Sequence, residues 1–112
     1  MPRKVWTQSI LAGAVYNPLD GWDYEFAPWP GRLEMVHRAS AVGLLSTVVS
    51  GSDRLQEEDP VPAGGTSGVT PTPFDSPALV DDFAARDRLK VSYRNPTGGT
   101  IVIDGYADIT PV

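Results

Sequence analysis

RLKVSYRNPTGGTIVIDGYADI, residues 88–109, is the stretch of sequence that decides the fold. Apolar and polar residues alternate over 89–94, which is the period-2 pattern of a strand with one buried face. The turn-forming sequence NPTGG follows at 95–99, and a second alternating run covers 101–109. The stretch therefore predicts a β-hairpin, with Gly105 marking a bulge or a close approach in its second strand. On the face of that strand opposite the apolar one we expect Asp104, Tyr106 and Asp108.

The rest of the chain reads as further short strands separated by turns. Eleven glycines and eleven prolines among 112 residues argue against helices, because both residues interrupt them. The turn at 50–53 would place 54–58 antiparallel beside 42–50, whereas 80–89 could instead form a helix. The other strands are expected at 5–9, 10–16, 22–26, 33–38 and 79–83. This pattern predicts an all-β fold, an antiparallel β-sandwich of jelly-roll type with about seven or eight strands.

Length and local composition predict a single domain over residues 1–112, with a short N-terminal arm over 1–7. Five prolines and three glycines fall within 60–77, so this segment is expected to be one long surface loop. The apolar run at 10–16 is short for a signal peptide and far too short for a membrane span. We therefore expect neither a cleaved signal nor a membrane partner.

The charge balance disfavours nucleic acid as a partner. Nine basic against 14 acidic residues give a net charge of −5, the wrong sign for neutralising phosphates. Seven of the nine basic residues are arginines, which suit ion pairs of fixed geometry at a surface or a subunit contact. With no cysteine and only one histidine, the chain offers no thiolate or multi-histidine metal site, and no cofactor is expected.

The aromatic stretch WDYEF at 22–26, followed by Trp29 between two prolines, has two interpretations. If 22–26 is a strand, its three rings share one face, and they could fill the core between two sheets. The same rings could instead form a stacking platform for sugars. Trp29 is expected at a rim or a subunit contact, because a Pro-Trp-Pro segment does not continue a ladder of hydrogen bonds.

No constellation of residues indicates catalysis. His37 alternates in phase with Leu33 and Met35, as expected for an inward-facing or interface histidine. Neither a nucleophile motif nor a phosphate-binding loop is present, so we expect no enzymatic activity. Acidic turns could bind Ca²⁺, although solvated turn carboxylates explain them as well. The acidic residues considered are Asp20, Asp23, Glu57, Glu58, Asp59, Asp81 and Asp82.

Three segments resemble known proteins: NPLDGWDYEF at 17–26, SGSD at 50–53 with QEE at 56–58, and RNPTGG at 94–99 before an Ile/Val strand. Together they resemble small β-sandwich cement or decoration proteins of tailed bacteriophages. The resemblance implies a non-enzymatic virion protein that sits on the capsid surface after synthesis in the host cytoplasm. It also implies two partners, the major capsid protein and other copies of the same chain in a trimer or dimer.

A decoration protein of this kind would use extended arms to lie across its neighbours. The N-terminal segment and the loop over 60–77 are suited to that role, since fixed proline φ angles reduce the entropy lost on docking. The residues expected at the protein interface are Arg3, Lys4, Trp6, Trp29, Pro71, Pro73 and Phe74. Two alternatives remain: a carbohydrate- or receptor-binding module that uses Trp22, Tyr24 and Trp29, and a single-jelly-roll capsid protein.

Overall fold

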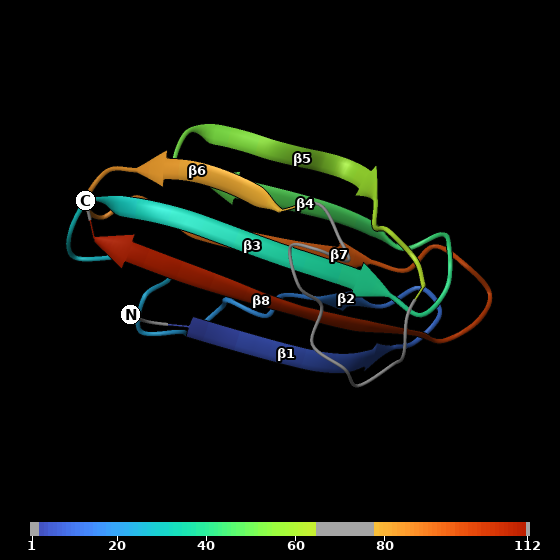
Figure 1. Cartoon of the computed structure of the whole chain (residues 1–112). Helices are drawn as coiled ribbons and strands as arrows, with labels where there is room; N and C mark the ends of the chain where they lie inside the picture. The colour runs from blue at the N-terminus through green and yellow to red at the C-terminus, as the bar shows by residue number, and fades with distance from the viewer. Residues whose placement is uncertain (1–2, 65–77, 112) are drawn as a thin grey trace.

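Residues 3–64 and 78–111 are described in a computed structural model, and they form two four-stranded antiparallel sheets (Figure 1). The first sheet has the strand order β1-β8-β3-β6 and the second β2-β7-β4-β5. The strands are β1 (Arg3–Ile10), β2 (Val15–Tyr16), β3 (Gly31–Ala39), β4 (Leu45–Ser50), β5 (Asp53–Pro60), β6 (Leu79–Phe83), β7 (Leu89–Arg94) and β8 (Ile101–Pro111).

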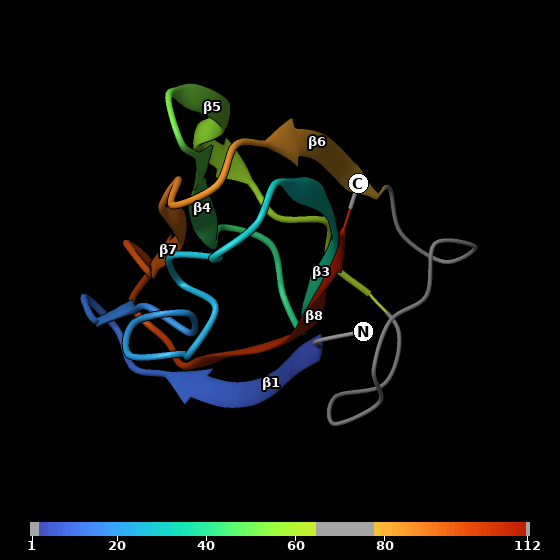
Figure 2. The ribbon, with the colours of Figure 1, turned by 90° about the vertical axis from the view of Figure 1, so that its left-hand side faces the viewer.

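The two sheets face each other across one hydrophobic core, as the view along the strands shows (Figure 2). Alternate residues of β7 and β8 point inward from opposite sheets and are buried, which is the packing that defines a β-sandwich. The predicted all-β antiparallel sandwich is therefore confirmed, while its jelly-roll type stays a prediction. The inward-facing residues of these two strands are Leu89, Val91, Tyr93, Ile101, Ile103, Ala107 and Ile109.

The predicted hairpin over 88–109 is wrong. β7 pairs with β4 and β2, whereas β8 pairs with β1 and β3, so the turn at 95–99 carries the chain from one sheet to the other. Alternation indicates only which side of a strand is buried. It is satisfied equally when two consecutive strands pair and when they face each other across a core, so the pattern could not separate the two arrangements.

The structure also decides the other strands that the sequence predicted. Residues 22–26 form turns and one isolated bridge instead of a strand, and residues 79–83 form β6, so the helical alternative over 80–89 is excluded. Of the predicted N-terminal arm over 1–7, residues 3–7 belong to β1 and pair with β8. By contrast, β5 does return antiparallel beside β4, as the turn at 50–53 predicts. Residues 65–77 of the predicted loop lie outside the described residues.

Gly105 allows a close approach, the second of the two roles predicted for it. The pairing of β8 with β1 and with β3 runs through this residue without a register shift, so no bulge is present. Trp6 stands opposite Gly105 on β1, and a Cβ atom on Gly105 would lie 2.7–2.8 Å from three atoms of the Trp6 indole. The indole is buried because a residue without a side chain lets it lie against the sheet.

Gly105→Ala is expected to lower the free energy of unfolding by about 1–3 kcal/mol, because the added methyl group overpacks the indole. Urea unfolding followed by tryptophan fluorescence would measure the change. Gly98→Ala is the matched control, since open space surrounds that glycine and its φ is not in the left-handed region. Equal effects of the two substitutions would contradict this account.

His37 and Tyr93 meet in the middle of the core, one from each sheet. A hydrogen bond of 2.8 Å joins the His37 Nδ1 atom to the Tyr93 hydroxyl. Burial lowers the pKa of His37 from 6.5 to about 4 and raises the pKa of Tyr93 well above its usual value. His37 is therefore the inward-facing, hydrogen-bonded residue that its alternation predicted.

The low pKa of His37 predicts that the protein loses stability in mild acid. Between pH 6.5 and about 4 the unfolded chain binds a proton on His37 and the folded chain does not, so the free energy of unfolding falls as the pH falls. The total loss by pH 4 is about 3 kcal/mol. Urea titrations at several pH values, compared with the same series for His37→Gln, would separate the contribution of His37 to the pH dependence from that of the carboxylates. Identical pH slopes for the two proteins would refute the prediction.

Candidate functional site

The loop between β2 and β3 places most of the aromatic residues at one end of the sandwich. Consecutive turns shape it, with the amide nitrogens of Asp20, Trp22 and Glu25 each donating to a carbonyl three residues back. Leu19 and Ala27 are fully buried and fasten the loop to the core. The loop covers the edge of β7 that the two-residue strand β2 leaves open, because the Leu89 amide donates to the Glu25 carbonyl at 2.8 Å.

The aromatic rings at this end pack against one another. Trp22 and Tyr24 meet edge to face with 5.4 Å between ring centroids, and Tyr24 is 6.1 Å from Trp29. Trp29 in turn lies 6.3 Å from the buried Phe83. Trp22, Tyr24 and Trp29 are half-buried and extend the core, and their neighbouring ring planes are inclined to each other by 64° and 44°. The expectation that the three rings of 22–26 share one strand face is wrong, because this segment turns.

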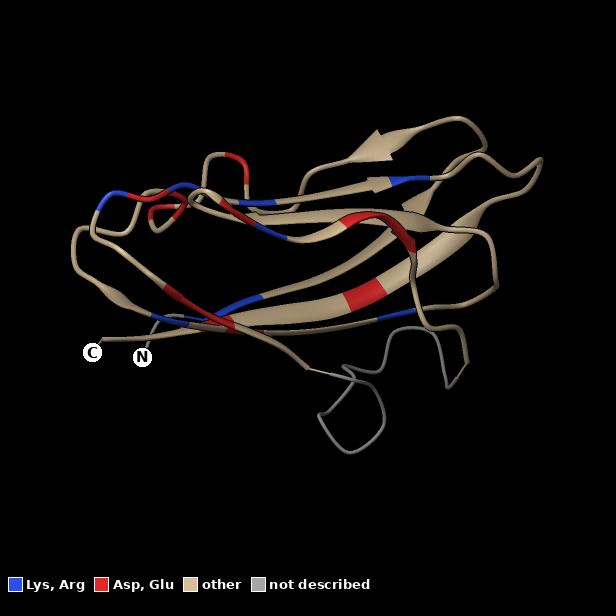
Figure 3. Ribbon diagram, turned by 90° about the horizontal axis from the view of Figure 1, so that it is seen from above, with Lys and Arg blue, Asp and Glu red and all other residues tan. Residues whose placement is uncertain are grey.

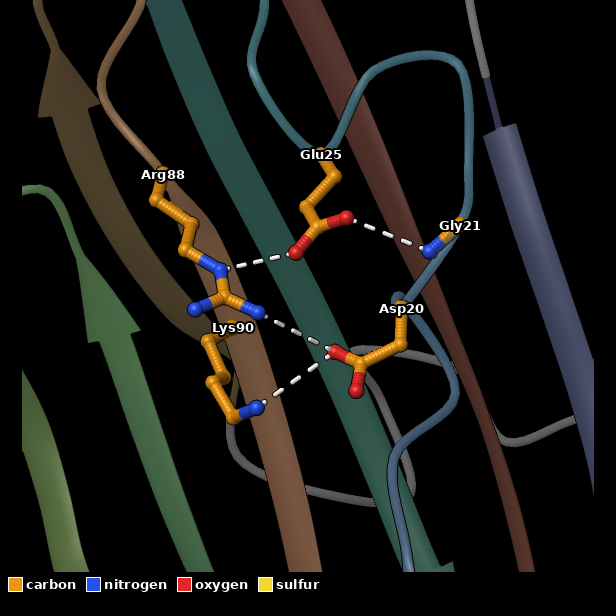
Figure 4. A network of polar contacts seen from close by, with 5 residues as sticks. All are labelled: Asp20, Gly21, Glu25, Arg88 and Lys90. Atoms are coloured by element: carbon orange, nitrogen blue, oxygen red, sulfur yellow. Dashed lines mark hydrogen bonds and ion pairs between the residues drawn. The ribbon is translucent and has the colours of Figure 1, made fainter.

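A polar network ties the same loop to β7 (Figure 4). The Glu25 carboxylate accepts a hydrogen bond from Arg88 Nε at 2.7 Å and another from the Gly21 amide at 3.1 Å. Asp20 lies 3.6 Å from Arg88 Nη2 and 3.5 Å from Lys90 Nζ. The Glu25 side chain is only 12% exposed, so it is the most sheltered acid of the network.

Glu25→Ala is expected to lower the free energy of unfolding by about 1–2 kcal/mol, because it removes two hydrogen bonds of a sheltered carboxylate. Urea unfolding would measure the loss. Asp23→Ala removes an exposed carboxylate of the same loop and is the control, with an expected change within about 0.5 kcal/mol. A control effect as large as that of Glu25→Ala would show that the network does not hold the loop.

The opposite end of the sandwich is built from three loops that contain no charged residue. We call residues 11–14, 40–44 and 95–100 the uncharged end; their sequences are LAGA, SAVGL and NPTGGT. Two of its aliphatic side chains are highly exposed, Leu11 at 65% and Val42 at 81%. The three loops lack charged residues in a chain in which 21% of the residues are charged, and depletion of charge is one property of the centre of a protein interface.

Asn95 holds the uncharged end together. Its fully buried side-chain amide donates to the carbonyl oxygens of Ile10 and Gly99 at 2.9 and 2.8 Å. Its own carbonyl accepts from the Gly13 amide at 2.7 Å, which joins the first loop to the third. The second loop reaches the third at Gly43, where φ is +107° and an added Cβ would lie 2.5 Å from the Thr97 side chain. The three loops therefore form one connected surface.

Of the residues predicted to form an interface, those that the structure describes lie on β1 and in the aromatic cluster. Arg3 lies exposed at the start of β1, where its guanidinium donates to Asp108 at 2.6 and 2.7 Å and lies over the Tyr106 ring. Lys4 is half-buried on the same strand, and Trp6 is buried at 3% exposure, which makes it a core residue. Trp29 belongs to the aromatic cluster. Pro71, Pro73 and Phe74 lie outside the described residues.

Many acidic side chains are held by arginines, and the two signs of charge are interleaved over the strands (Figure 3). Arg32 donates to Asp82 at 2.9 Å across β3 and β6. Arg94 binds both carboxylate oxygens of Glu58, and its hydrogen bonds lower the pKa of that carboxyl. These arginines take the surface ion-pair role that their abundance predicted. Tyr106 and Asp104 are buried, although their face of β8 was expected to be the polar one.

Sequence reasoning missed the Glu25–Arg88 pair and the uncharged end. Glu25 and Arg88 lie 63 positions apart, and no local pattern connects them. The uncharged end did leave a signal, since its three segments lack charge, but nothing in the sequence shows that they adjoin. Within residues 3–64 and 78–111 no group of three or more acidic or histidine residues could hold a metal, and the surface has no pocket. None of the elements described in that part is a helix that could span a membrane.

The geometry defines the described part of the chain as an antiparallel β-sandwich with one uncharged loop end. Comparison with known proteins finds no matching family model, no similar curated protein and no similar solved structure.

Proposed function

We propose that this protein is a non-enzymatic structural virion protein that binds the outside of a phage capsid and stabilises it by bridging major capsid protein subunits. The observation that carries the proposal is the uncharged end, where Leu11 and Val42 are exposed on loops without charged residues. The resemblance of residues 17–26, 50–53 and 94–99 to tailed-phage decoration proteins supports the same role.

The shape of the uncharged end suits contact with a firm protein surface. Asn95 and Gly43 fix the three loops relative to one another, so little loop entropy is lost when they dock. Exposed aliphatic side chains gain free energy when another protein covers them, and the absence of charge avoids the cost of desolvating ions. These properties fit a subunit whose task is adhesion to a shell.

The remainder of the body suits a clamp. Cross-strand ion pairs such as Arg3–Asp108 and Arg32–Asp82 cover its outer faces, and the chain has no cysteine that oxidation could alter. Bridging requires that each bound decoration protein, whether one chain or an oligomer, makes two contacts with the shell. An oligomer that carries several copies of the uncharged end supplies them without a second kind of docking surface.

Binding to shells would test the function. The protein is expected to co-sediment with shells assembled from the major capsid protein of the same phage, and to raise the temperature at which those shells come apart. Val42→Asp places a charge on the uncharged end and is expected to weaken binding roughly tenfold or more.

Ala85→Asp is the matched control for this experiment, because it adds the same charge to an exposed loop at the opposite end of the sandwich. Shells that never bind the protein would refute the proposed function. Equal loss of binding by the two variants would refute the assignment of the uncharged end as the docking surface.

A further inference from the structure

The two sheets have four edge strands, and three of these edges are protected against pairing with another chain. β5 shifts register twice against β4, carries Glu58 at a φ of +50° and ends at Pro60. β6 has only five residues, and two of them are aspartates. β2 has two residues, and the loop at 17–26 covers the rest of that edge. Irregularity, charge, short length and coverage are the means by which proteins block edge-to-edge association.

β1 is long, regular and, among residues 3–64 and 78–111, uncovered along the edge that faces away from β8, and its two charged residues, Arg3 and Lys4, lie at its first two positions. It is eight residues long, pairs with β8 without a register shift and contains no proline, glycine or acidic residue. Its outward-facing side chains include Val5, which is 46% exposed, and the exposed Thr7. Among residues 3–64 and 78–111, no other strand pairs with this edge. Unpaired amide and carbonyl groups on a regular strand of this length are a template for a further strand.

We propose that the free edge of β1 pairs with β1 of a second copy of this chain, antiparallel and around a two-fold axis. The sheets that contain β1 in the two copies would then join into one continuous sheet. Its strand order would be β6-β3-β8-β1 in one copy, continued by β1-β8-β3-β6 in the other. Such an interface is self-complementary, so it closes at a dimer. The inference does not depend on binding to a shell, although a dimer would supply the two contacts that bridging needs.

The register of this pairing follows from the faces of β1. Facing residues of an antiparallel pair point to the same side of the sheet. Odd-numbered residues of β1 must therefore face odd-numbered residues of the partner's β1, and even-numbered residues must face even-numbered ones. The two-fold axis therefore passes through a residue, and Trp6 or Thr7, the two central residues of Arg3–Ile10, give the longest overlap of the two strands. In the first register Val5 faces Thr7, and in the second Thr7 faces itself.

Charge favours the antiparallel arrangement and a second copy as the occupant. In either antiparallel register Arg3 and Lys4 face uncharged residues, whereas a parallel in-register pair would set Lys4 beside Lys4. The Arg3 charge is already matched by Asp108 on the neighbouring strand. All 14 acidic residues lie outside β1, so no carboxylate of one chain lies on the strand that would pair with its copy, although each chain has a net charge of −5.

The first test is the oligomeric state of the full chain by sedimentation at concentrations about tenfold apart. We expect a reversible dimer. Val5→Lys is expected to raise its dissociation constant roughly tenfold or more, since lysine on an edge opposes pairing. Val80→Lys is the matched control, because Val80 is 52% exposed on β6 at the other edge of the same sheet. A monomer at every concentration, a trimer, or a dimer that Val5→Lys leaves intact would overturn the proposal.

Cross-linking tests the register independently of how well Val5→Lys folds. The chain has no cysteine, so single-cysteine variants report one position each. Facing residues of an antiparallel pair lie within disulfide range. We expect oxidation to link either Thr7→Cys to itself or Val5→Cys to Thr7→Cys, and to leave Val80→Cys unlinked. Equal cross-linking of Val80→Cys would overturn the proposal. Shell binding by a protein that stays monomeric would assign the edge of β1 to another occupant and reject the second copy.

Discussion

The packing of Trp6 over Gly105 is the interaction on which the rest of the sandwich depends. In the β1-β8-β3-β6 sheet, Gly105 lies between Trp6 on β1 and His37 on β3. The Tyr93 ring of the opposite sheet contacts both Trp6 and His37. Ring centroids lie 6.4 Å apart for Trp6 and Tyr93, and 5.5 Å for His37 and Tyr93. One position without a side chain thus lets four strands from two sheets meet. The hydrogen bond between His37 and Tyr93 satisfies the His37 Nδ1 atom and the Tyr93 hydroxyl, which this contact buries.

Alternation in the sequence predicted the strands well where one face is buried and one exposed. It succeeded for 89–94 and 101–109, and the turn at 50–53 correctly paired β5 with β4. It could not predict how the strands pair, because an inward-facing residue looks the same in a hairpin and in two opposed sheets. The segment 22–26 misled for a related reason. Its aromatic residues alternate as in a strand, but the amides of Trp22 and Glu25 each donate to a carbonyl three residues earlier, and these hydrogen bonds fold the segment into turns.

The candidate site was less predictable than the fold, since it depends on contacts between distant segments. The sequence placed Trp6 in an N-terminal arm, next to Arg3 and Lys4. In the structure Trp6 and Ile10 lie on the same face of β1, and both are buried. The uncharged end is three ordinary turns in the sequence. Only the buried Asn95 amide, with its reach from Ile10 to Gly99, shows that they form one surface.

The antiparallel pairing of β1 with β8 also sets how the protein responds to force. Arg3 pairs with Asp108, so the start of β1 and the end of β8 lie side by side at one end of the molecule (Figure 1). Tension that draws these two strand ends apart acts along the hydrogen bonds between them, because the bonds between antiparallel strands run perpendicular to the strands. The bonds then break one pair at a time, beginning beside the Arg3–Asp108 ion pair, as a zip opens.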